Sequence, residues 1–139
     1  KKEGFITGEQ DIYTFIEHHP KLKKRTLFTG FIELDELKAL YSLCALFIFP
    51  SLYEGFGLPP LEALACGARV ISSNRASMPE VLKDQATYFD PTSSDDLLHA
   101  IDTELSTERT KQHISKHLAE YTWGKTFEAC QKTLAVFKS

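Results

Sequence analysis

Short apolar runs alternate with helix-like segments along most of this chain, and no other feature constrains its fold as strongly. The run from Ala45 to Pro50 is apolar without alternation, which is typical of a parallel strand covered on both faces of its sheet. Strand-like runs separated by helices predict βαβ units. We therefore predict an α/β fold built on a doubly wound parallel sheet.

The expected elements follow from the spacing of apolar residues and from turn residues. Strands are predicted at residues 4–7, 26–31, 45–50, 69–72 and 87–90. Helices are predicted at residues 9–19, 33–44, 59–65, 77–83, 94–105 and 107–121, with a charged turn at 20–25 and a last helix after Thr122. Ser77 and Glu80 have the spacing of a capping box. Because the helical tail lies outside the alternation, we predict a domain at 1–106, incomplete at its N-terminus, and a helical extension at 107–139.

The composition excludes several classes of function. Of the 139 residues, 42% are hydrophobic and 25% are charged, which is typical of a soluble globular domain. The net charge of −3 gives no reason to expect binding to nucleic acid, and no apolar run reaches the length of a membrane span. The three cysteines lie far apart without a CxxC motif, which argues against a disulfide framework and indicates a reducing cytoplasm.

The segment after residues 45–50 contains the strongest candidate site, since open α/β sheets bind ligands at the carboxyl ends of their strands. Residues 51–62 read Ser-Leu-Tyr-Glu-Gly-Phe-Gly-Leu-Pro-Pro-Leu-Glu. Two glycines flank Phe56, and glycine lets a ligand approach the main chain closely. Two prolines then open a helix. The start of that helix favours an anion such as pyrophosphate, because of its unpaired N–H groups and the positive end of its dipole.

Two glutamates bracket this predicted anion site. Glu54 lies just before it, and Glu62 lies on the first turns of the helix. A carboxylate accepts hydrogen bonds from sugar hydroxyls, two at a time from a vicinal diol. The spacing therefore suits a nucleoside-diphosphate sugar, with one glutamate on the transferred hexose and the other on the ribose. The alternative is that both glutamates are solvated side chains without a ligand.

Residues 54–67 resemble the E-x7-E segment of the retaining glycosyltransferase family that includes glycogen and sucrose synthases and many bacterial mannosyl- and glucosyltransferases. Residues 29–41 are similar to the family's "GF/GY…EL…LY" stretch, and residues 69–81 to its "PVI.SN…PEV" stretch. Asp90-Pro91 and the Tyr-Thr-Trp of residues 121–123 fit as well. The resemblance implies a GT-B enzyme with two Rossmann-like domains, of which residues 1–106 are the nucleotide-sugar-binding one, in the C-terminal half.

The resemblance also implies roles for individual residues. Glu54, the catalytic residue, would contact hydroxyls of the donor hexose, and Glu62 would hold the ribose. In the family, main-chain N–H groups matching Phe56, Gly57 and Leu58 bind the sugar and the diphosphate. The full set of donor-binding residues expected beside Glu62 is Gly55, Phe56, Gly57 and Leu58 in the loop, with Gly30, Phe31 and Ile32 bordering the nucleobase.

The chemistry implied by the resemblance is hexose transfer with retention of configuration, without an obligatory metal, to a glycan or lipid-linked acceptor. Basic side chains and the helix dipole would stabilise the departing diphosphate, so Glu54 is not expected to be a covalent nucleophile. The family's diphosphate-binding Arg and Lys, and its acceptor-binding N-terminal domain, have no counterpart in this sequence. We therefore expect this chain alone to be inactive, and expect peripheral attachment to the inner face of the membrane only through that other domain.

Two alternatives remain at this point. The chain could be a catalytically inactive nucleotide-sugar-binding module, or a doubly wound signalling receiver, although Asp90 is its one strand-end aspartate and Pro91 follows it. His113 and His117 are four residues apart, but Ile114 stands where a zinc protease has glutamate, so no metal site is expected. Arg75 could lie near the site, but a plain surface arginine is the favoured interpretation. The nucleotide, hexose, acceptor and linkage are not indicated by the sequence.

Overall fold

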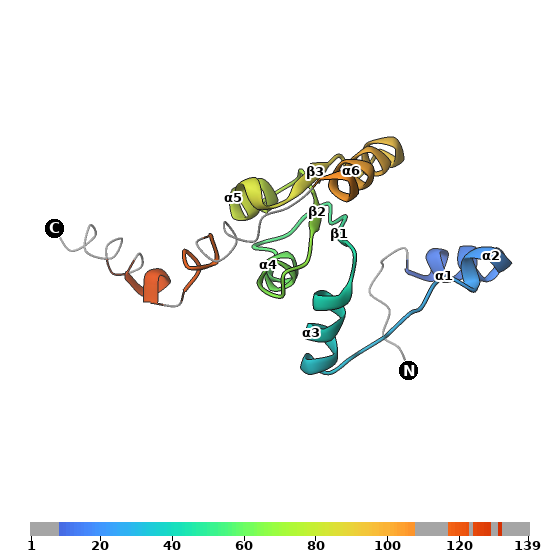
Figure 1. The fold of residues 1–139 in the computed structure, drawn as a ribbon, viewed down its shortest axis with the longest axis horizontal. Helices are drawn as coiled ribbons and strands as arrows, with labels where there is room; N and C mark the ends of the chain where they lie inside the picture. Colours follow the sequence, from blue (N-terminus) through green and yellow to red (C-terminus); the bar gives the residue numbers. More distant parts are fainter. Residues whose placement is uncertain (1–8, 108–116, 123, 129–130, 132–139) are drawn as a thin grey trace. The chain divides into compact units, whose positions relative to one another are not determined.

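The computed structural model describes residues 9–107, 117–122, 124–128 and 131 of the chain. Its contacts divide the chain into two units, Lys1–Glu33 and Leu34–Ser139, and each is described here by itself (Figure 1). The first unit contains helices α1 (Glu9–Glu17) and α2 (Pro20–Lys23). The second contains a parallel sheet and its covering helices. The boundary predicted at residues 106 and 107 stays a prediction.

In the first unit, α1 confirms the helix predicted at residues 9–19. Residues 20–23 form a short helix where a turn was expected, because Pro20 at its first position needs no hydrogen-bond partner. Residues 26–31 are not a strand, so that prediction was wrong. A strand needs a laddered neighbour, and the sheet in the described part of the chain consists of strands from the second unit. The strand predicted at residues 4–7 lies outside the described residues.

The sheet of the second unit has three parallel strands in the order β1-β2-β3. Their bounds are β1 (Phe47–Phe49), β2 (Val70–Ser73) and β3 (Thr87–Phe89). The covering helices are α3 (Leu34–Leu43), α4 (Leu58–Ala65), α5 (Met78–Leu82) with the 3-10 turn η1 (Lys83–Gln85), and α6 (Ser94–Ser106). Helix α4 joins β1 to β2 and α5 joins β2 to β3, so both connections are the predicted βαβ units (Figure 1).

The central strand β2 is buried on both faces. Val70 and Ile71 are fully buried but belong to different clusters, because neighbouring residues of a strand point to opposite faces. The cluster around Val70 contains residues of α3, α4 and α5, whereas Ile71 packs with Phe89 and with Ala100 of α6. Two covered faces confirm the predicted α/β fold with helices around a parallel sheet.

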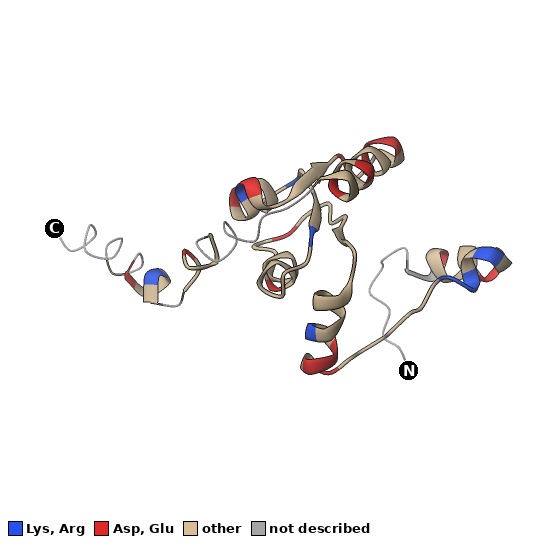
Figure 2. Ribbon diagram, in the orientation of Figure 1, with Lys and Arg blue, Asp and Glu red and all other residues tan. Residues whose placement is uncertain are grey.

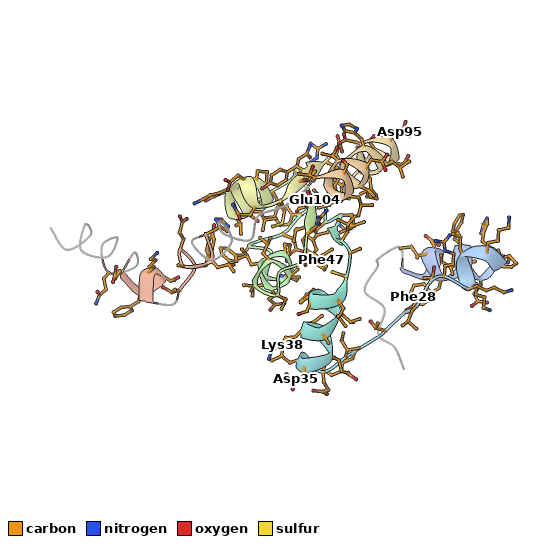
Figure 3. The ribbon with its side chains drawn as sticks, in the orientation of Figure 1. Phe28, Asp35, Lys38, Phe47, Asp95 and Glu104 are labelled. Atoms are coloured by element: carbon orange, nitrogen blue, oxygen red, sulfur yellow. The ribbon has the colours of Figure 1, made fainter. Side chains whose placement is uncertain are left out.

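Charged residues lie where helix ends favour them. Asp35 and Glu36 occupy the first turn of α3, and Asp95 and Asp96 that of α6 (Figure 2), where acidic side chains face the positive end of the helix dipole. Near its other end, α6 is fastened to the sheet by Glu104 (Figure 3). That buried side chain accepts a hydrogen bond of 2.6 Å from the Thr87 hydroxyl at the start of β3.

Two residues of the predicted tail, His117 and Tyr121, contact α5. The buried His117 ring lies 2.9 Å from the carbonyl oxygen of Val81, and the Tyr121 hydroxyl donates to the same oxygen at 2.7 Å. Since a carbonyl only accepts, Nε2 is the His117 ring nitrogen that donates in this contact. The Thr122 hydroxyl accepts from the Lys125 main-chain N–H at 3.3 Å, as the predicted N-cap of the last helix would. In the described part of the chain, no helix is long and apolar enough to cross a membrane.

Candidate functional site

The β1–α4 loop, residues 50–57, leaves the carboxyl end of β1 and contains Glu54, which is half-buried. The hydroxyl of Ser51 lies 3.1 Å from the carbonyl oxygen of Tyr53 and 3.2 Å from Glu54 Oε1, so its single hydrogen is shared between these two acceptors. The main chain of Ser51 is held in turn, because the hydroxyl of Ser73, at the end of β2, donates to its carbonyl at 2.6 Å. Ser73 is fully buried. The start of the loop, before Glu54, is therefore hydrogen-bonded to the central strand β2.

Ser77 fastens the same loop from a different element. Its hydroxyl donates to the main-chain carbonyl of Glu54 at 3.2 Å. The capping box predicted for Ser77 and Glu80 was wrong, because Ser77 has helical backbone angles and makes no side-chain capping bond. A capping residue needs non-helical angles, and here the hydroxyl is used by the loop instead.

Gly57 ends the loop and is required there for two reasons. It has a φ of +81°, in the left-handed region that glycine alone adopts without strain. A Cβ atom at this position would also lie 2.2 Å from the Cε of the buried Met78 side chain at the start of α5. Gly55 differs, since a Cβ atom there would meet nothing within 4 Å. The two glycines, both predicted to let a ligand approach the main chain, thus have different surroundings. Gly57 is closely packed, and the space around Gly55 is open.

The first turn of α4 offers fewer N–H donors than the sequence suggests. Its second and third residues, Pro59 and Pro60, have none. The main-chain N–H groups of Phe56, Gly57 and Leu58 precede them, and no acceptor for these three is found in the described part of the chain. Leu58 is exposed. N–H donors without an acceptor among the described residues therefore extend through residues 51–58, and that those of residues 56–58 bind an anion stays a prediction.

Glu62 lies one turn further along α4 and is exposed. The hydroxyl of the buried Tyr41, from α3, is 3.5 Å from Glu62 Oε2. Burial raises the pKa of Tyr41, and the negative charge of Glu62 raises it further. Tyr41 therefore stays protonated in the neutral range and presents a donor to the glutamate.

The structure brings one part of the predicted site together in a single unit. Glu54 and Glu62 flank the N–H donors of residues 56–58 within one loop and helix. Gly30, Phe31 and Ile32 belong to the first unit. Within it, Gly30 has a left-handed φ of +62° and the Phe31 ring is almost completely exposed.

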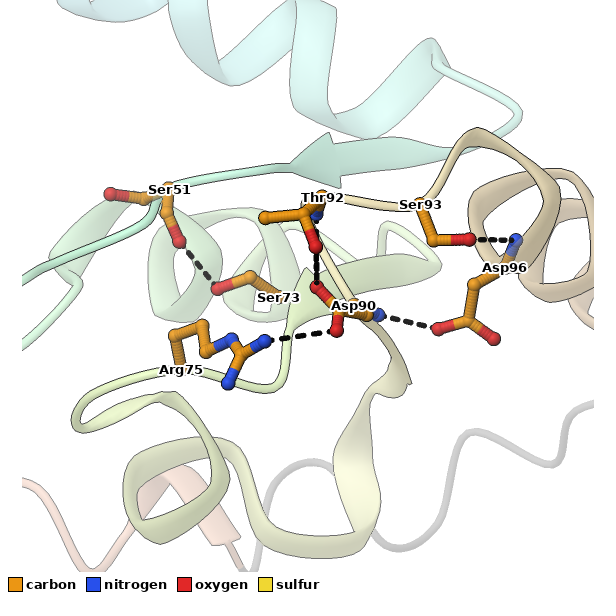
Figure 4. A network of polar contacts seen from close by, with 7 residues as sticks. All are labelled: Ser51, Ser73, Arg75, Asp90, Thr92, Ser93 and Asp96. Carbon is orange, nitrogen blue, oxygen red and sulfur yellow. Dashed lines mark hydrogen bonds and ion pairs between the residues drawn. The ribbon is translucent and has the colours of Figure 1, made fainter.

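A polar network at the carboxyl ends of the strands was missed from the sequence (Figure 4). Arg75 is exposed, as expected, and its guanidinium lies 2.9 Å from Asp90 Oδ2. Asp90 also accepts from the hydroxyl and the main-chain N–H of Thr92. These bonds, and then Arg75, lower the pKa of Asp90. The Asp-x-Thr pattern at residues 90–92 was the available signal for the turn.

This pairing does not fit the receiver alternative, which needs a strand-end aspartate beside further acids and a lysine. The partner of Asp90 is an arginine, and its own main-chain N–H is bonded to Asp96. Among the described residues, no group of three or more His, Cys, Asp and Glu side chains is arranged to hold a metal ion. His113 lies outside them.

Comparison with known proteins agrees with the family resemblance of the sequence. Residues 6–120 of the 139-residue chain match the family model described as glycosyl transferases group 1. The serotype-specific mannosyltransferase WbdA of Escherichia coli is 40% identical over 123 residues, which are 86% of this chain and 15% of that protein. The O-antigen chain mannosyltransferase B of Escherichia coli is 44% identical over 92 residues, 66% of this chain and 24% of that protein.

The fold has a counterpart among solved structures. Sucrose-phosphate synthase from Thermosynechococcus elongatus superposes with a TM-score of 0.79 at 24% identity, covering 99% of this chain and 37% of that one. The likeness extends to the fold alone, and it is the GT-B fold predicted from the sequence. The chain spans a small part of the length of the curated relatives that it matches. By the match over residues 6–120, the chain belongs to the group 1 glycosyltransferases.

Proposed function

We propose that this chain is the donor-binding half of a retaining hexosyltransferase and that it binds a nucleoside-diphosphate hexose between Glu54 and Glu62. The observation that carries the proposal is the run of N–H groups at residues 56–58. They have no acceptor from the described residues, and they precede the first turn of α4 between two carboxylates. A diphosphate satisfies such donors and is favoured by the positive end of a helix dipole.

The sugars of the donor would occupy the two sides of this anion site. Glu54, with one carboxylate oxygen held by Ser51, accepts hydrogen bonds from hydroxyls of the hexose. Glu62 is exposed on α4 and accepts from the ribose diol, while Tyr41 limits the positions of its carboxylate. That Gly30, Phe31 and Ile32 border the nucleobase stays a prediction from the family resemblance. Gly55 leaves room for the donor to approach the main chain.

In the proposed reaction the bond between the anomeric carbon and the diphosphate breaks, and the acceptor hydroxyl attacks from the same face, with retention. The departing diphosphate takes the acceptor's proton. N–H groups at residues 56–58 stabilise its charge, without an obligatory metal. Glu54 orients the hexose and forms no covalent bond to it.

The relatives point to a hexose and to a class of acceptor. Those matched are described as serotype-specific and O-antigen chain mannosyltransferases. We propose mannose as the transferred hexose and a glycan or lipid-linked glycan of a bacterial surface polysaccharide as the acceptor. An acceptor-binding domain would complete the enzyme in the cytoplasm and attach it peripherally to the inner face of the membrane.

Calorimetry with UDP-, GDP- and ADP-mannose tests the donor site. We expect one nucleotide series to bind and Glu62→Ala to weaken that binding about tenfold, the loss typical of a hydrogen bond to a charged group. Glu80→Ala is the matched control, because Glu80 is an exposed glutamate at the start of α5 without a role in the site. Equal affinities of Glu62→Ala and the parent chain would remove Glu62 from the site.

Transfer assays separate the enzyme from an inactive binding module of the same fold. A protein that joins this chain to an acceptor-binding domain should transfer labelled hexose to an acceptor, whereas a binding module would bind the donor and return it unchanged. That this chain alone transfers little or no sugar stays a prediction. Transfer catalysed by the 139-residue chain by itself would contradict it.

A further inference from the structure

We propose that Ser77 is a positioning residue for Glu54, so that the β2–α5 turn, residues 74–77, determines the affinity for the sugar part of the donor. The inference rests on the proposed function, because it acts through Glu54. It assigns Ser77 no contact with the donor itself. The starting observation is that a serine expected to cap α5 donates to the carbonyl of Glu54 instead, at 3.2 Å.

Glu54 is held at two points by two serines. Ser77 fixes its main-chain carbonyl, and Ser51 lies 3.2 Å from its carboxylate oxygen Oε1. Ser51 is itself fixed to β2 through Ser73. The second carboxylate oxygen, Oε2, has no partner among the described residues. This arrangement leaves one oxygen for a ligand and limits the rotation of the rest.

The turn that presents Ser77 is constrained from both sides. Before it, Arg75 is ion-paired with Asp90 at 2.9 Å. After it, Met78 is buried against Gly57, at the other end of the same loop. Between these anchors Ala76 adopts a φ of +50°, in the left-handed region that alanine avoids. Such strain persists only where the surrounding structure fixes the backbone, and it is concentrated at functional sites.

A constrained turn has a specific consequence for binding. A carboxylate that is already oriented loses less conformational freedom when a sugar binds, and so more of each hydrogen bond appears as affinity. Residues 56–58, which would bind the diphosphate, are not bonded to Ser77. Loss of the Ser77 hydroxyl should therefore weaken binding of the sugar and spare the nucleoside diphosphate.

Calorimetry of Ser77→Ala with GDP and GDP-mannose, and with UDP and UDP-mannose, tests the proposal. For the nucleotide that the parent chain binds, we expect about fivefold weaker binding of the nucleotide sugar, the loss typical of one neutral hydrogen bond. Binding of the nucleoside diphosphate should stay within twofold. Ser77→Thr keeps the hydroxyl and should restore the parent affinity. Equal losses for both ligands, or no loss for either, would overturn the proposal.

NMR relaxation gives a readout that needs no ligand. In Ser77→Ala the backbone order parameters of residues 53–55 should fall below those of the parent chain, while Ser94→Ala, a substitution of an exposed serine in the first turn of α6, leaves them unchanged. If the parent binds no nucleotide sugar, the proposed function fails and the affinity claim fails with it. Unchanged order parameters in Ser77→Ala would overturn the positioning role whether or not the donor binds.

Discussion

Two connections at the carboxyl edge of the sheet use the same kinds of residue in opposite ways. In the β3–α6 turn, residues 90–93, the aspartate is bonded on each side, to Thr92 and to Arg75, and Ser93 caps α6 by accepting from the Asp96 N–H. In the β1–α4 loop, Glu54 keeps one carboxylate oxygen unbonded within the described residues, and three N–H groups follow without acceptors from them.

The two connections therefore differ in what their polar groups are available for, the turn in stabilising the fold and the loop in binding a ligand. A turn whose polar groups satisfy one another contributes to folding and has nothing left for a ligand. A loop fastened by Ser73 and Ser77, with donors and an acceptor still unpaired, is prepared for a polar ligand. Substitutions in the turn should therefore change stability and leave binding intact, and substitutions at the unpaired groups of the loop should do the reverse.

The largest effect is expected at Gly57. This residue lies in the loop but also supports the fold, so its substitution should change stability and is an exception to the comparison. Gly57→Ala places a Cβ atom against Met78 in a left-handed backbone and should cost about 3 kcal/mol of unfolding free energy. Gly55→Ala should change it by less than about 0.5 kcal/mol, since nothing lies near. Urea titrations followed by circular dichroism measure both. Equal losses would show that the loop tolerates no side chain at either glycine.

A smaller effect on binding, without loss of stability, is expected at Glu54. Glu54→Gln keeps the shape of the side chain but removes its charge, and should weaken nucleotide-sugar binding roughly tenfold, since bonds to charged groups exceed neutral ones. The urea midpoint should stay that of the parent chain. A lowered midpoint with unchanged affinity would assign Glu54 to the fold, as Asp90 is assigned.

The smallest effect is expected at Asp90, and it depends on pH. Its folded-state pKa is lowered, so its ionised form stabilises the fold above the unfolded-state pKa, and that stabilisation is lost as pH falls through the folded-state value. Asp90→Asn should therefore be less stable than the parent at pH 7, with the difference shrinking below about pH 4. Urea titrations at pH 7 and pH 3 measure it. A constant difference would contradict this role, and reduced donor affinity would contradict the comparison.

The sequence predicts a candidate site whose residues are contiguous in the chain. Glu54, Gly57 and Glu62 lie in one short stretch, so their relation along a loop and helix follows from local rules. The bonds that fix this stretch were not predictable, because Ser77 and Ser73 reach it from another strand and turn, 22 or 23 residues away. The capping-box spacing predicted Ser77 as the N-cap of α5, but its hydroxyl instead makes a tertiary hydrogen bond to the carbonyl of Glu54.

The elements outside the site show the same limit. The three strands were predicted correctly in place, but β1 and β3 are shorter than predicted and β2 is shifted by one residue, since their ends follow the register between the strands. The strand predicted at residues 26–31 has the right composition, but strand formation depends on a paired neighbour and not on composition alone. The helix α2 was predictable, because Pro20 marks a first helical position.

The most direct test of the account is an amide NMR titration of the chain with the nucleoside diphosphate of the series that binds in calorimetry. We predict the largest shifts at Phe56, Gly57 and Leu58, because their N–H groups would receive the diphosphate, with small shifts at Thr92 and Ser93 in the β3–α6 turn. Saturable shifts concentrated away from residues 56–58 would contradict the claim that the start of α4 holds the donor.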